Sequence, residues 1–510
     1  GLLKFDFLGI RNLAILADAI SLVKKFYNID IDIEHIPLDD KKTFSLLAKG
    51  ETEGLFQLNG SGMTRYLKEL KPTSIHDINA MVALYLPGPM ESIPEYIKRK
   101  HNPRLIKYLD PRMKKYLGES YGIIVYQDDL LLSAIELAGY NWEEADKFRK
   151  AVGKKIPAEM AAQREKFTKG IIANGQTPDF AEKLWKLFEP FQAYGFGKAH
   201  AASYGKVAYQ TAYMKAHYPV EYMSAILTAE SGDVEKIGKI INECKNMKIS
   251  VLPPNINESF GGFTVVGKQI RFGFYTIKNL GTDISDAIIR ERENPPAGGG
   301  KFKSITDFLD RIKHKNLNKK SMEALIKSGS FDEWGERGML LFNLEEMLGY
   351  NHEMSKQSEN QVSLFGGASV ITAPQFKLNP APDASQTEKL LWEKELLGLY
   401  ISGHPLDRIR EKLESRNMNI KKIKEEVGNG MSIVIAGIIE TSRQVITRGN
   451  ERMAFLKIAD LTGSIEAVAF PSIFKESIDI LVAEKCIALS GKISLRNGEK
   501  SIIIEGVKEV

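Results

Sequence analysis

The hydrophobic pattern of this 510-residue chain changes its period near residue 430. Before that point, apolar residues recur mostly at helical spacing, over about 11–26, most of 51–250 and 391–425. From Met431 to Val510, short runs rich in β-branched residues alternate with turns such as Arg448-Gly449-Asn450. Such a length also exceeds what one hydrophobic core usually serves. The pattern therefore predicts a multidomain protein, predominantly α-helical, with a C-terminal all-β domain.

Composition excludes several classes of protein. Lys and Arg number 70 against 65 Asp and Glu, so the overall charge gives no sign of a nucleic-acid binder. Two cysteines, Cys244 and Cys486, cannot build a disulfide framework or a cysteine zinc site, which favours a reducing cytoplasm. No apolar run reaches about 18 residues, so we expect no membrane-spanning helix. The chain starts at Gly1, and we expect it to be a piece of a longer protein.

Glycine, proline and polar stretches divide the chain into segments. We place them at 1–50, 51–258, 259–348, 349–390, 391–430 and 431–510. The first begins with a strand-like stretch before its helix, the third with two short strand-like runs, and the fourth reads as a polar linker. In the last segment, five β-like runs with a helical Phe474–Leu481 between the third and fourth suit a small five-stranded barrel.

The clearest helix of the second segment leads into a basic stretch. Asn141 and Glu144 match a capping box, while Gly153 and Pro157 favour the end of the helix. Residues 147–169 hold eight cations against two glutamates, a local excess of six positive charges. The cations are Lys147, Arg149, Lys150, Lys154, Lys155, Arg164, Lys166 and Lys169. Such crowding suits a phosphate ligand, and a solvated helix face is the alternative.

A glycine and aromatic cluster at residues 193–200 follows this stretch. Its glycines would let the backbone approach phosphates, and its tyrosine could stack on a base. Gly197-Lys198-Ala199 is not a phosphate loop, because the preceding spacing fails and Ala199 stands where a magnesium-binding Ser or Thr is required. His200 and His217 lack cysteine or histidine partners at ligand spacing, which argues against zinc.

Carboxylates near the N-terminus are candidate metal ligands. Asp6 lies beside Lys4 on the strand-like start, where a salt bridge is the simpler interpretation of an isolated pair. Asp30 and Asp32 would share one face of an extended strand, as a two-metal site requires. We favour a polar loop edge for this second pair. Further along, Asp128-Asp129 is expected to favour a helix N-terminus.

Two short patterns point to contacts with partners. Ile277-Lys278-Asn279-Leu280-Gly281 before a helix resembles the hairpin of a helix-hairpin-helix element, whose glycine turn presents N–H groups to a DNA phosphate. An ordinary strand-to-helix turn is the alternative. Gln361-Val362-Ser363-Leu364-Phe365 is an apolar island within the polar linker. Such an island usually docks into a pocket of another protein, and contact with its own domain is the alternative.

Long phrases of the sequence resemble the catalytic alpha subunit of bacterial DNA polymerase III, the C-family replicative polymerase. The phrases include Lys4-Phe5-Asp6-Phe7-Leu8-Gly9, Ile36-Pro37-Leu38-Asp39-Asp40, Gly54-Leu55-Phe56-Gln57-Leu58, Tyr121-Gly122-Ile123-Ile124-Val125-Tyr126-Gln127, Lys215-Ala216-His217-Tyr218-Pro219, Leu252-Pro253-Pro254-Asn255-Ile256-Asn257 and Gly398-Leu399-Tyr400-Ile401-Ser402-Gly403-His404-Pro405. The resemblance extends over nearly the whole chain.

The resemblance implies a polymerase-beta-like palm, helical fingers, a helix-hairpin-helix region, a clamp-binding peptide and an OB fold, in that order. The chain would begin inside the palm, so its fold class would be a partial α/β palm, a mainly α body and a C-terminal OB barrel. Asp6 matches the family's third metal-binding aspartate and Lys4 a triphosphate-side lysine. The other two aspartates, a phosphoesterase-like domain and a segment after the OB fold would lie outside this sequence. We therefore expect the chain alone to bind DNA without polymerising, and we reject Asp30 and Asp32 as metal ligands.

The resemblance also implies site residues. Those matching positions near the incoming triphosphate, the template and the nucleotide pocket are Arg149, Lys150, Lys154, Lys155, Tyr194, Lys198 and His200. Those matching the DNA-binding hairpin are Lys278 and Gly281, and those matching the sliding-clamp peptide are Gln361, Leu364 and Phe365. The sequence departs from the family where Gly197 and Ala199 replace a usual Asn and Ser, and where Leu86 replaces an Arg.

The implied activity is template-directed DNA synthesis from dNTPs on primer-template DNA, with two Mg²⁺ ions assisting phosphoryl transfer. The implied partners are the sliding clamp and the proofreading and clamp-loader subunits, in the bacterial cytoplasm at the nucleoid. The OB barrel would hold single-stranded template. One rival is a non-catalytic DNA-binding scaffold. Another is a DNA ligase, which needs Lys-x-Asp-Gly, whereas Lys4-Phe5-Asp6 is followed by Phe7.

Overall fold

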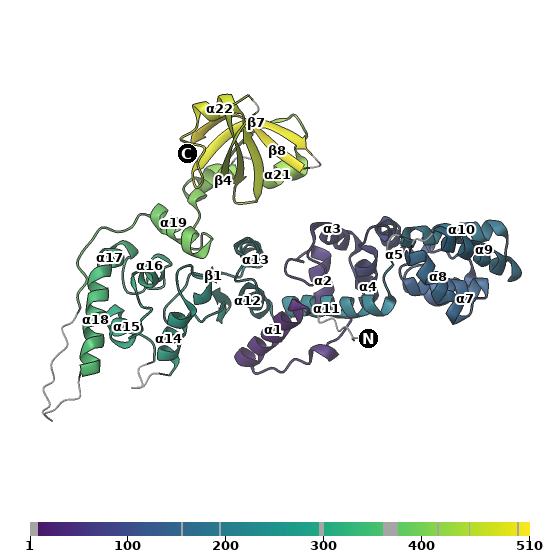
Figure 1. Cartoon of the computed structure of the whole chain (residues 1–510), viewed down its shortest axis with the longest axis horizontal. Coiled ribbons are helices and arrows are strands. Elements are labelled where there is room, and N and C mark those ends of the chain that lie inside the picture. Colours follow the sequence, from purple (N-terminus) through teal and green to yellow (C-terminus); the bar gives the residue numbers. More distant parts are fainter. Residues whose placement is uncertain are drawn as a thin grey trace. The chain divides into compact units, whose positions relative to one another are not determined.

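The computed structural model describes residues 9–154, 157–192, 195–294, 300–360, 376–415, 418–447, 449–496 and 499–510. The chain divides into two compact units between Phe302 and Lys303 (Figure 1). Both contain mainly helices, and the second ends in a closed five-stranded barrel, which confirms the predicted fold class. The strand-like start at residues 1–8 lies outside the described residues. Within the described ranges, none of the helices has the length and apolar character that a membrane span requires.

The first unit is built mainly of helices. Their bounds are α1 Arg11–Tyr27, α2 Lys41–Lys49, α3 Ser61–Leu70, α4 Ile75–Leu84, α5 Ile93–His101, α6 Lys114–Leu117, α7 Gln127–Ala138, α8 Trp142–Lys154, α9 Pro157–Ala173, α10 Pro178–Phe188, α11 Lys198–His217, α12 Pro219–Ala229, α13 Val234–Asn246 and α14 Thr282–Glu293. The helix predicted at 11–26 is α1. The predicted capping box opens α8, because the backbone N–H of Asn141 donates to Glu144 Oε2 (3.0 Å) and that of Glu144 to Asn141 Oδ1 (2.9 Å).

Helix α11 lies at the centre of the first unit, against α1, α2, α4 and α12. It is rich in alanine and buried on several sides, so other helices can approach it closely. The closest approach is at Gly205, where an added Cβ would lie 1.8 Å from Oδ1 of Asn79 on α4. Only glycine fits this crossing. The path of α11 is therefore set by backbone packing as well as by side-chain burial.

The C-terminal half of α11 is fixed by the buried ammonium group of Lys215. Its Nζ donates to the backbone oxygens of Glu51 and Glu53, both at 2.8 Å, and to Oε1 of Glu243 on α13 at 2.6 Å. Burial lowers the pKa of this ammonium, while the nearby carboxylates oppose the shift. Three oxygen acceptors satisfy the buried charge, so α11, α13 and the turn after α2 are held together at one point.

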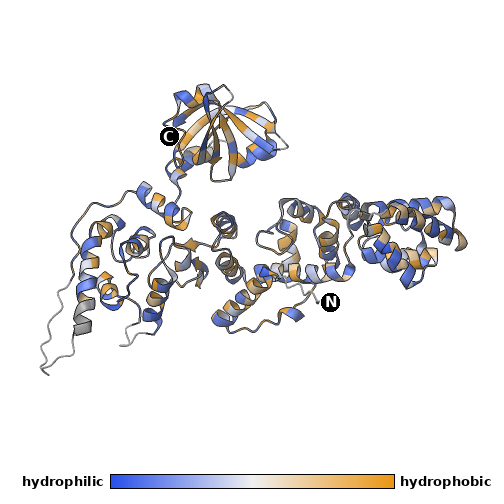
Figure 2. Ribbon diagram, viewed as in Figure 1, coloured by the Kyte–Doolittle hydropathy of each residue, from blue (hydrophilic) through white to orange (hydrophobic). Residues whose placement is uncertain are grey.

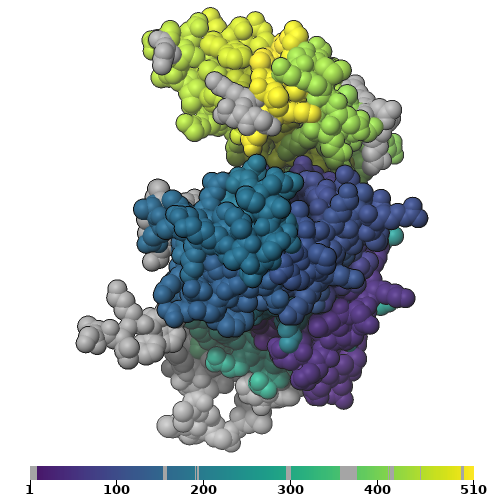
Figure 3. Space-filling model, turned by 90° about the vertical axis from the view of Figure 1, so that its right-hand side faces the viewer, coloured from purple at the N-terminus to yellow at the C-terminus, as the bar shows by residue number. Residues whose placement is uncertain are grey.

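Helices α7 to α10 form a lobe with an aromatic core. Phe148 of α8 and Phe167 of α9 stack with ring centroids 5.7 Å apart and planes 8° apart. Trp185 and Phe188 of α10 complete the cluster. All four side chains are buried, and each stabilises the fold by about 1.5–3 kcal/mol. Figure 3 shows this lobe facing the viewer in blue. Several charged side chains of α8 and α9, among them Lys147 and Glu165, are exposed.

A small sheet follows α13 and leads to the predicted hairpin. Its strands are β1 Val251–Leu252, β2 Thr264–Val266 and β3 Gln269–Arg271, in the order β1-β3-β2. The antiparallel pair β2 and β3 confirms the two strand-like runs, and Gly267 at φ +60° makes the turn between them. Strand β1 pairs with β3 in parallel and was not predicted, because two residues carry no alternation.

The second unit begins with helices α15 Ile305–Arg311, α16 Lys319–Lys327, α17 Arg337–Phe342, α18 Leu344–Asn360, α19 Gln386–Leu397, α20 Arg410–Ser415 and α21 Ile420–Glu426. Helix α18 continues through 349–360, which the sequence analysis assigned to the linker. The buried amide of Asn351 explains the difference, because it donates to the backbone oxygens of Leu309 (2.7 Å) and Ile312 (3.0 Å). These bonds hold α18 against the end of α15, so the polar composition of the stretch does not prevent a helix.

The barrel strands are β4 Ser432–Ile446, β5 Arg452–Ala459, β6 Ser464–Ala469, β7 Cys486–Arg496 and β8 Glu499–Glu509. They close in the order β4-β5-β6-β8-β7, with β6 and β8 parallel. The long strand β4 pairs with both β5 and β7, and an irregularity between Ile439 and Thr441 lets it bend from one neighbour to the other. Apolar and polar residues alternate along these strands, as Figure 2 shows. The five predicted runs are thus confirmed as one closed barrel.

Two helices complete the barrel. Helix α22 (Pro471–Glu476) lies between β6 and β7 in sequence, as predicted, but it begins and ends earlier than Phe474–Leu481. Pro471 favours this earlier start because proline suits the first helical position. Ile420 and Ile423 of α21 are fully buried in the barrel core. Helix α21, which the sequence analysis placed in a connector, therefore contributes to the core of the barrel.

Replacing Ile423 by alanine should destabilise the barrel by about 2–5 kcal/mol, because the change leaves a cavity in the core. Hydrogen exchange of the β4–β8 amides in the whole chain would measure this loss. The matched control is Ile446→Ala on the same barrel, where the side chain is 68% exposed and little change is expected. Equal exchange rates in the two variants would show that α21 does not belong to the barrel core.

Candidate nucleic-acid and nucleotide interface

Several of the predicted site residues lie outside the described part of the chain. They are Lys4, Asp6, Lys155, Tyr194, Gln361, Leu364 and Phe365, together with the side chain of Lys154. Their assignments stay predictions. The remaining candidates are Arg149, Lys150, Lys198, His200, Lys278 and Gly281.

His200 lies within a run of aromatic rings at the start of α11. Its ring centroid is 4.7 Å from that of Phe196 and 4.3 Å from that of Tyr204, which in turn lies 5.2 Å from Phe56. His200 and Tyr204 are four residues apart in α11 and share one face of the helix, and Phe196 of the preceding loop packs against both rings. His200 is exposed and the other three residues are half-buried, so the His200 ring is the one that a planar base can reach from solvent. Phe56, Phe196 and Tyr204 were not predicted as site residues, although the four-residue spacing of Phe196, His200 and Tyr204 was a visible signal.

Lys198 is the first residue of α11 and lies beside this ring run. Its Nζ is 3.1 Å from Oε2 of Glu119, and it lies 5.9 Å from the ring centroid of Tyr126. His76 Nδ1 is 3.5 Å from the same carboxylate. The Lys198–Glu119 pair is about half exposed, and such pairs contribute little to stability. Lys198 can therefore exchange this partner for an anionic ligand at small cost.

Asp128 and Asp129 of α7 lie at a helix N-terminus, as the sequence predicted. Both lie in the first turn of that helix. Asp129 Oδ2 accepts the backbone N–H groups of Val125 (2.8 Å) and Tyr126 (2.9 Å). Burial raises the pKa of the Asp129 carboxyl to about 6 in spite of these hydrogen bonds. The carboxylate anchors the turn that leads into α7.

The basic stretch is more neutral than its sequence window indicated. In the described part of α8 and α9, six of its cations contact a carboxylate. The pairs are Lys147–Glu143, Arg149–Asp146, Lys150–Asp146, Arg164–Glu182, Lys166–Glu144 and Lys169–Glu165. Four of the five acids lie outside 147–169, so a count over that window missed them. The local charge alone is thus a weak argument for a phosphate site, and the roles of Arg149 and Lys150 stay predictions.

Arg149 nevertheless points toward the glycine and aromatic cluster. Its Nε and Nη2 donate to Asp146 Oδ1 at 3.1 and 2.8 Å, and its Nη1 donates to Oε1 of Gln127 at 3.4 Å. The amide of Gln127 in turn donates to the backbone oxygen of Gly195 at 2.7 Å. The structure therefore links Arg149 to the loop that precedes Lys198 and His200.

Asp30 and Asp32 form a polar edge, as the sequence analysis favoured. Asp32 caps the short 3₁₀ helix η1 (Ile33–His35) by accepting the N–H of Glu34 at 3.1 Å, and Asp30 pairs with Lys24. A hydrogen bond from His35 is the main cause that lowers the pKa of the Asp32 carboxyl. Across the described residues, no three His, Cys, Asp or Glu side chains lie together as ligands for a metal ion. The described side chains do not by themselves form the Mg²⁺ site that the resemblance implies.

The predicted hairpin is an ordered turn before α14. Ile277 and Leu280 are buried anchors, Asn279 is left-handed at φ +68°, and Lys278 is exposed. Gly281 is the N-cap of α14 and, being glycine, has no side chain to accept the first helical N–H groups. Such a helix start can accept a phosphate. The geometry is compatible with the DNA contact that was predicted for Lys278 and Gly281, and does not test it.

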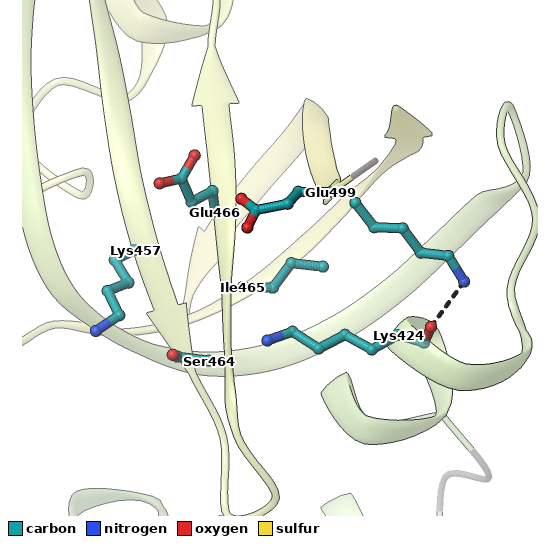
Figure 4. Close-up of a pocket in the computed structure, with 7 residues that line it drawn as sticks. Lys424, Lys457, Ser464, Ile465, Glu466 and Glu499 are labelled. Carbon is teal, nitrogen blue, oxygen red and sulfur yellow. Dashed lines mark hydrogen bonds between the residues drawn. The ribbon is translucent and has the colours of Figure 1, made fainter. Parts of the chain in front are cut away.

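The outer face of the barrel carries a second candidate surface. Phe455 of β5 is 41% exposed, with Arg443 of β4 and Val468 of β6 directly opposite on the two neighbouring strands. Two residues further along β5, Lys457 lies opposite Glu466 of β6. A shallow pocket of about 430 Å³ adjoins this row, and its lining residues are Lys424, Lys457, Ser464, Ile465, Glu466, Glu499 and Lys500 (Figure 4). An exposed aromatic ring on the second strand of such a barrel, with Arg443 on the first strand and Lys457 on the second nearby, suits a single-stranded nucleic acid.

Comparison with known proteins agrees with this arrangement. The bacterial DNA polymerase III alpha subunit finger domain matches residues 12–175, a helix-hairpin-helix motif matches 248–339, and an OB-fold nucleic acid binding domain matches 433–510. All three lie in the order that the sequence analysis expected.

Three similar proteins are named DNA polymerase III subunit alpha. The protein from Thermus aquaticus is 41% identical over 498 residues, which cover 94% of this chain and 40% of that protein. Those from Borreliella burgdorferi and Mycobacterium tuberculosis are 38% and 36% identical, over 100% and 99% of this chain and 44% and 43% of theirs. The chain thus spans about two fifths of the length of these relatives. Matches of this extent show that the chain belongs to the family of bacterial DNA polymerase III alpha subunits.

Proposed function

We propose that this chain forms the fingers, helix-hairpin-helix and OB-fold part of a replicative DNA-directed DNA polymerase, which adds dNMP units to a primer 3′-hydroxyl. The names of its relatives support the reaction. The observation that carries the proposal is the accessible ring run at the start of α11, with Lys198 beside it and Arg149 linked to the same loop. Aromatic faces and cations are what a base and a triphosphate need.

In the proposed mechanism, the described residues bind and orient the nucleotide. Lys198 and Arg149 would offset the charge of the triphosphate, each giving up an exposed carboxylate partner. His200 would stack against the incoming nucleotide, and Tyr204 and Phe56 would fix the plane of its ring. Base identity would follow from pairing with the template inside a fitted pocket. Asp6 and Lys4 remain the proposed Mg²⁺ ligand and triphosphate lysine, on the resemblance alone.

DNA would be held at two further places. Lys278 and the start of α14 at Gly281 would contact the backbone of duplex primer-template without reading its sequence. The outer face of the barrel around Phe455 would hold single-stranded template. We propose that each unit carries one of these surfaces.

Protein partners would include the sliding clamp, bound through Gln361, Leu364 and Phe365, and the proofreading and clamp-loader subunits. The described residues on either side of this peptide support its use as a tether. Asn343 and Asn379 exchange two hydrogen bonds of 2.9 and 2.8 Å. Tyr350 and Phe376 also lie in contact, with ring centroids 5.5 Å apart. Eleven residues after Phe365, at Phe376, the described chain is thus packed against α18 again.

A non-catalytic DNA-binding scaffold is the alternative. Its hairpin and barrel would bind DNA in the same way, but it would not use the ring run for nucleotides. Dependence of nucleotide incorporation on His200 therefore distinguishes the two proposals.

Replacing His200 by alanine in the intact polymerase should raise the KM for dNTPs about tenfold, because stacking on a base is worth about 1–3 kcal/mol. Steady-state incorporation on a primed template measures this change. The matched control is His217→Ala at the other end of α11, whose ring is 2.9 Å from Asp40 and away from the ring run. If both variants kept the parental KM, the ring run would not be the nucleotide site.

On the barrel, Phe455→Ala should weaken binding of a single-stranded oligothymidylate by about 1–3 kcal/mol, since the stacking surface is lost. Fluorescence anisotropy with the 510-residue chain itself would give the Kd. Phe470→Ala is the control, because Phe470 is 46% exposed but precedes α22 instead of lying on β5. An equal loss in both variants would contradict the proposed surface.

A further inference from the structure

Two residues at the start of α7 make three hydrogen bonds to the backbone of residues 195–198, where the loop leads into α11. The N–H of Gln127 donates to the oxygen of Phe196 at 3.0 Å, and the Gln127 side chain to the oxygen of Gly195 at 2.7 Å. Asp128 Oδ2 accepts the N–H of Lys198 at 2.6 Å. Residues 127 and 128 thus contact three of the four residues 195–198, across a separation of about seventy positions in sequence.

Asp128 acts as the cap of a helix to which it does not belong. The N-cap of α11 is Gly197, which has no side chain to accept the first N–H groups of the helix. Asp128 supplies that acceptor from α7, and its negative charge is favourable at the positive end of the α11 dipole. The position at which α11 begins, and with it the position of Lys198, therefore depends on α7.

Both the nitrogen and the oxygen of the Gln127 side-chain amide form hydrogen bonds. Its nitrogen donates to Gly195, and its oxygen accepts from Arg149 Nη1 at 3.4 Å. These two contacts fix the orientation of the amide, because exchanging its nitrogen and oxygen would set an oxygen against an oxygen and a donor against a donor. Gln127 thus lies between the cation on α8 and the loop before α11.

Gly195 lets this contact form. An added Cβ would lie 2.6 Å from Cγ of Gln127 and 3.0 Å from its Nε2, so the loop and the side chain meet without space between them. The three atoms nearest to that Cβ all belong to Gln127. Any larger residue at 195 would displace either the loop or the amide.

We propose that Gln127 is a positioning residue for the incoming nucleotide: it sets the distance between Arg149 and the Lys198–His200 end of α11. This inference rests on the proposed function of the ring run. It assigns Gln127 no contact with substrate. Its effect is to keep two groups on different helices at the spacing that one nucleotide requires, so a small displacement of either group weakens the binding of the nucleotide.

The first test is Gln127→Glu in the intact polymerase. This change keeps the shape and the contact with Arg149, but it replaces the donor to Gly195 by an acceptor. We expect the KM for dNTPs to rise about tenfold, with kcat changed less than about threefold and the Kd for primer-template unchanged. Gln176→Glu is the matched control: its Nε2 donates to Asp110 at 2.9 Å from a similarly half-buried site outside the loop. Its melting temperature should fall at least as much, while its KM stays at the parental value.

The second test is a double-mutant cycle of Gln127→Ala and Gly195→Ala. Alone, Gly195→Ala should raise the KM, because its Cβ meets the Gln127 side chain. In the Gln127→Ala background those atoms are gone, so the same change should have little further effect. Independent effects that multiply would overturn the proposal, and so would a parental KM in Gln127→Glu.

The experiments distinguish a wrong role for Gln127 from a wrong position of the nucleotide site. If His200→Ala and Lys198→Ala raise the KM while Gln127→Glu does not, the positioning role is wrong and the proposed nucleotide site stands. If neither His200→Ala nor Lys198→Ala raises the KM, the nucleotide site itself is wrong and the positioning role falls with it.

Discussion

The buried Lys215 ammonium is the interaction on which the rest of the first unit depends. Three oxygens from α13 and the turn after α2 surround it, so the C-terminal half of α11 has one allowed position. Removing one partner of such a buried charge typically costs about 3–5 kcal/mol. With this end fixed and Gly205 packed on α4, the N-terminal end of α11 reaches the lobe of α7 to α10 as a rigid extension.

Because the C-terminal half of α11 is fixed, the residues at its N-terminal end are held in defined positions for binding. The first turns of α11 carry the ring run and Lys198, and the lobe supplies both the cap for this helix and the nearby Arg149. The lobe is stabilised by its aromatic core, so its charged faces need not contribute to folding. Weak, exposed ion pairs such as Lys147–Glu143 and Lys169–Glu165 lie on those faces and can open for a polyanion. In this lobe, the buried aromatic residues therefore stabilise the fold, and the exposed charged residues are free to bind a ligand.

Features that depend on neighbours in sequence were predictable. The capping box at Asn141 and the alternation of the barrel strands are local patterns, and the structure contains both. The charge balance of α8 and α9 was not predictable from a window, because Glu182 and Glu144 approach from other turns and helices. Phe56 could not be assigned to the ring run for the same reason, since it contacts Tyr204 from about 150 residues away. Within the site, the types of residue could be predicted and their partners could not.

The most direct test of the nucleotide site is photocrosslinking of the intact polymerase on primed template with a dATP analogue that carries an azido group on the base, followed by mapping of the labelled peptides. The account predicts that label lies within residues 195–206 and is lost when unlabelled dATP is added in excess. Labelling that is specific for dATP, yet confined to peptides outside 195–206, would contradict it.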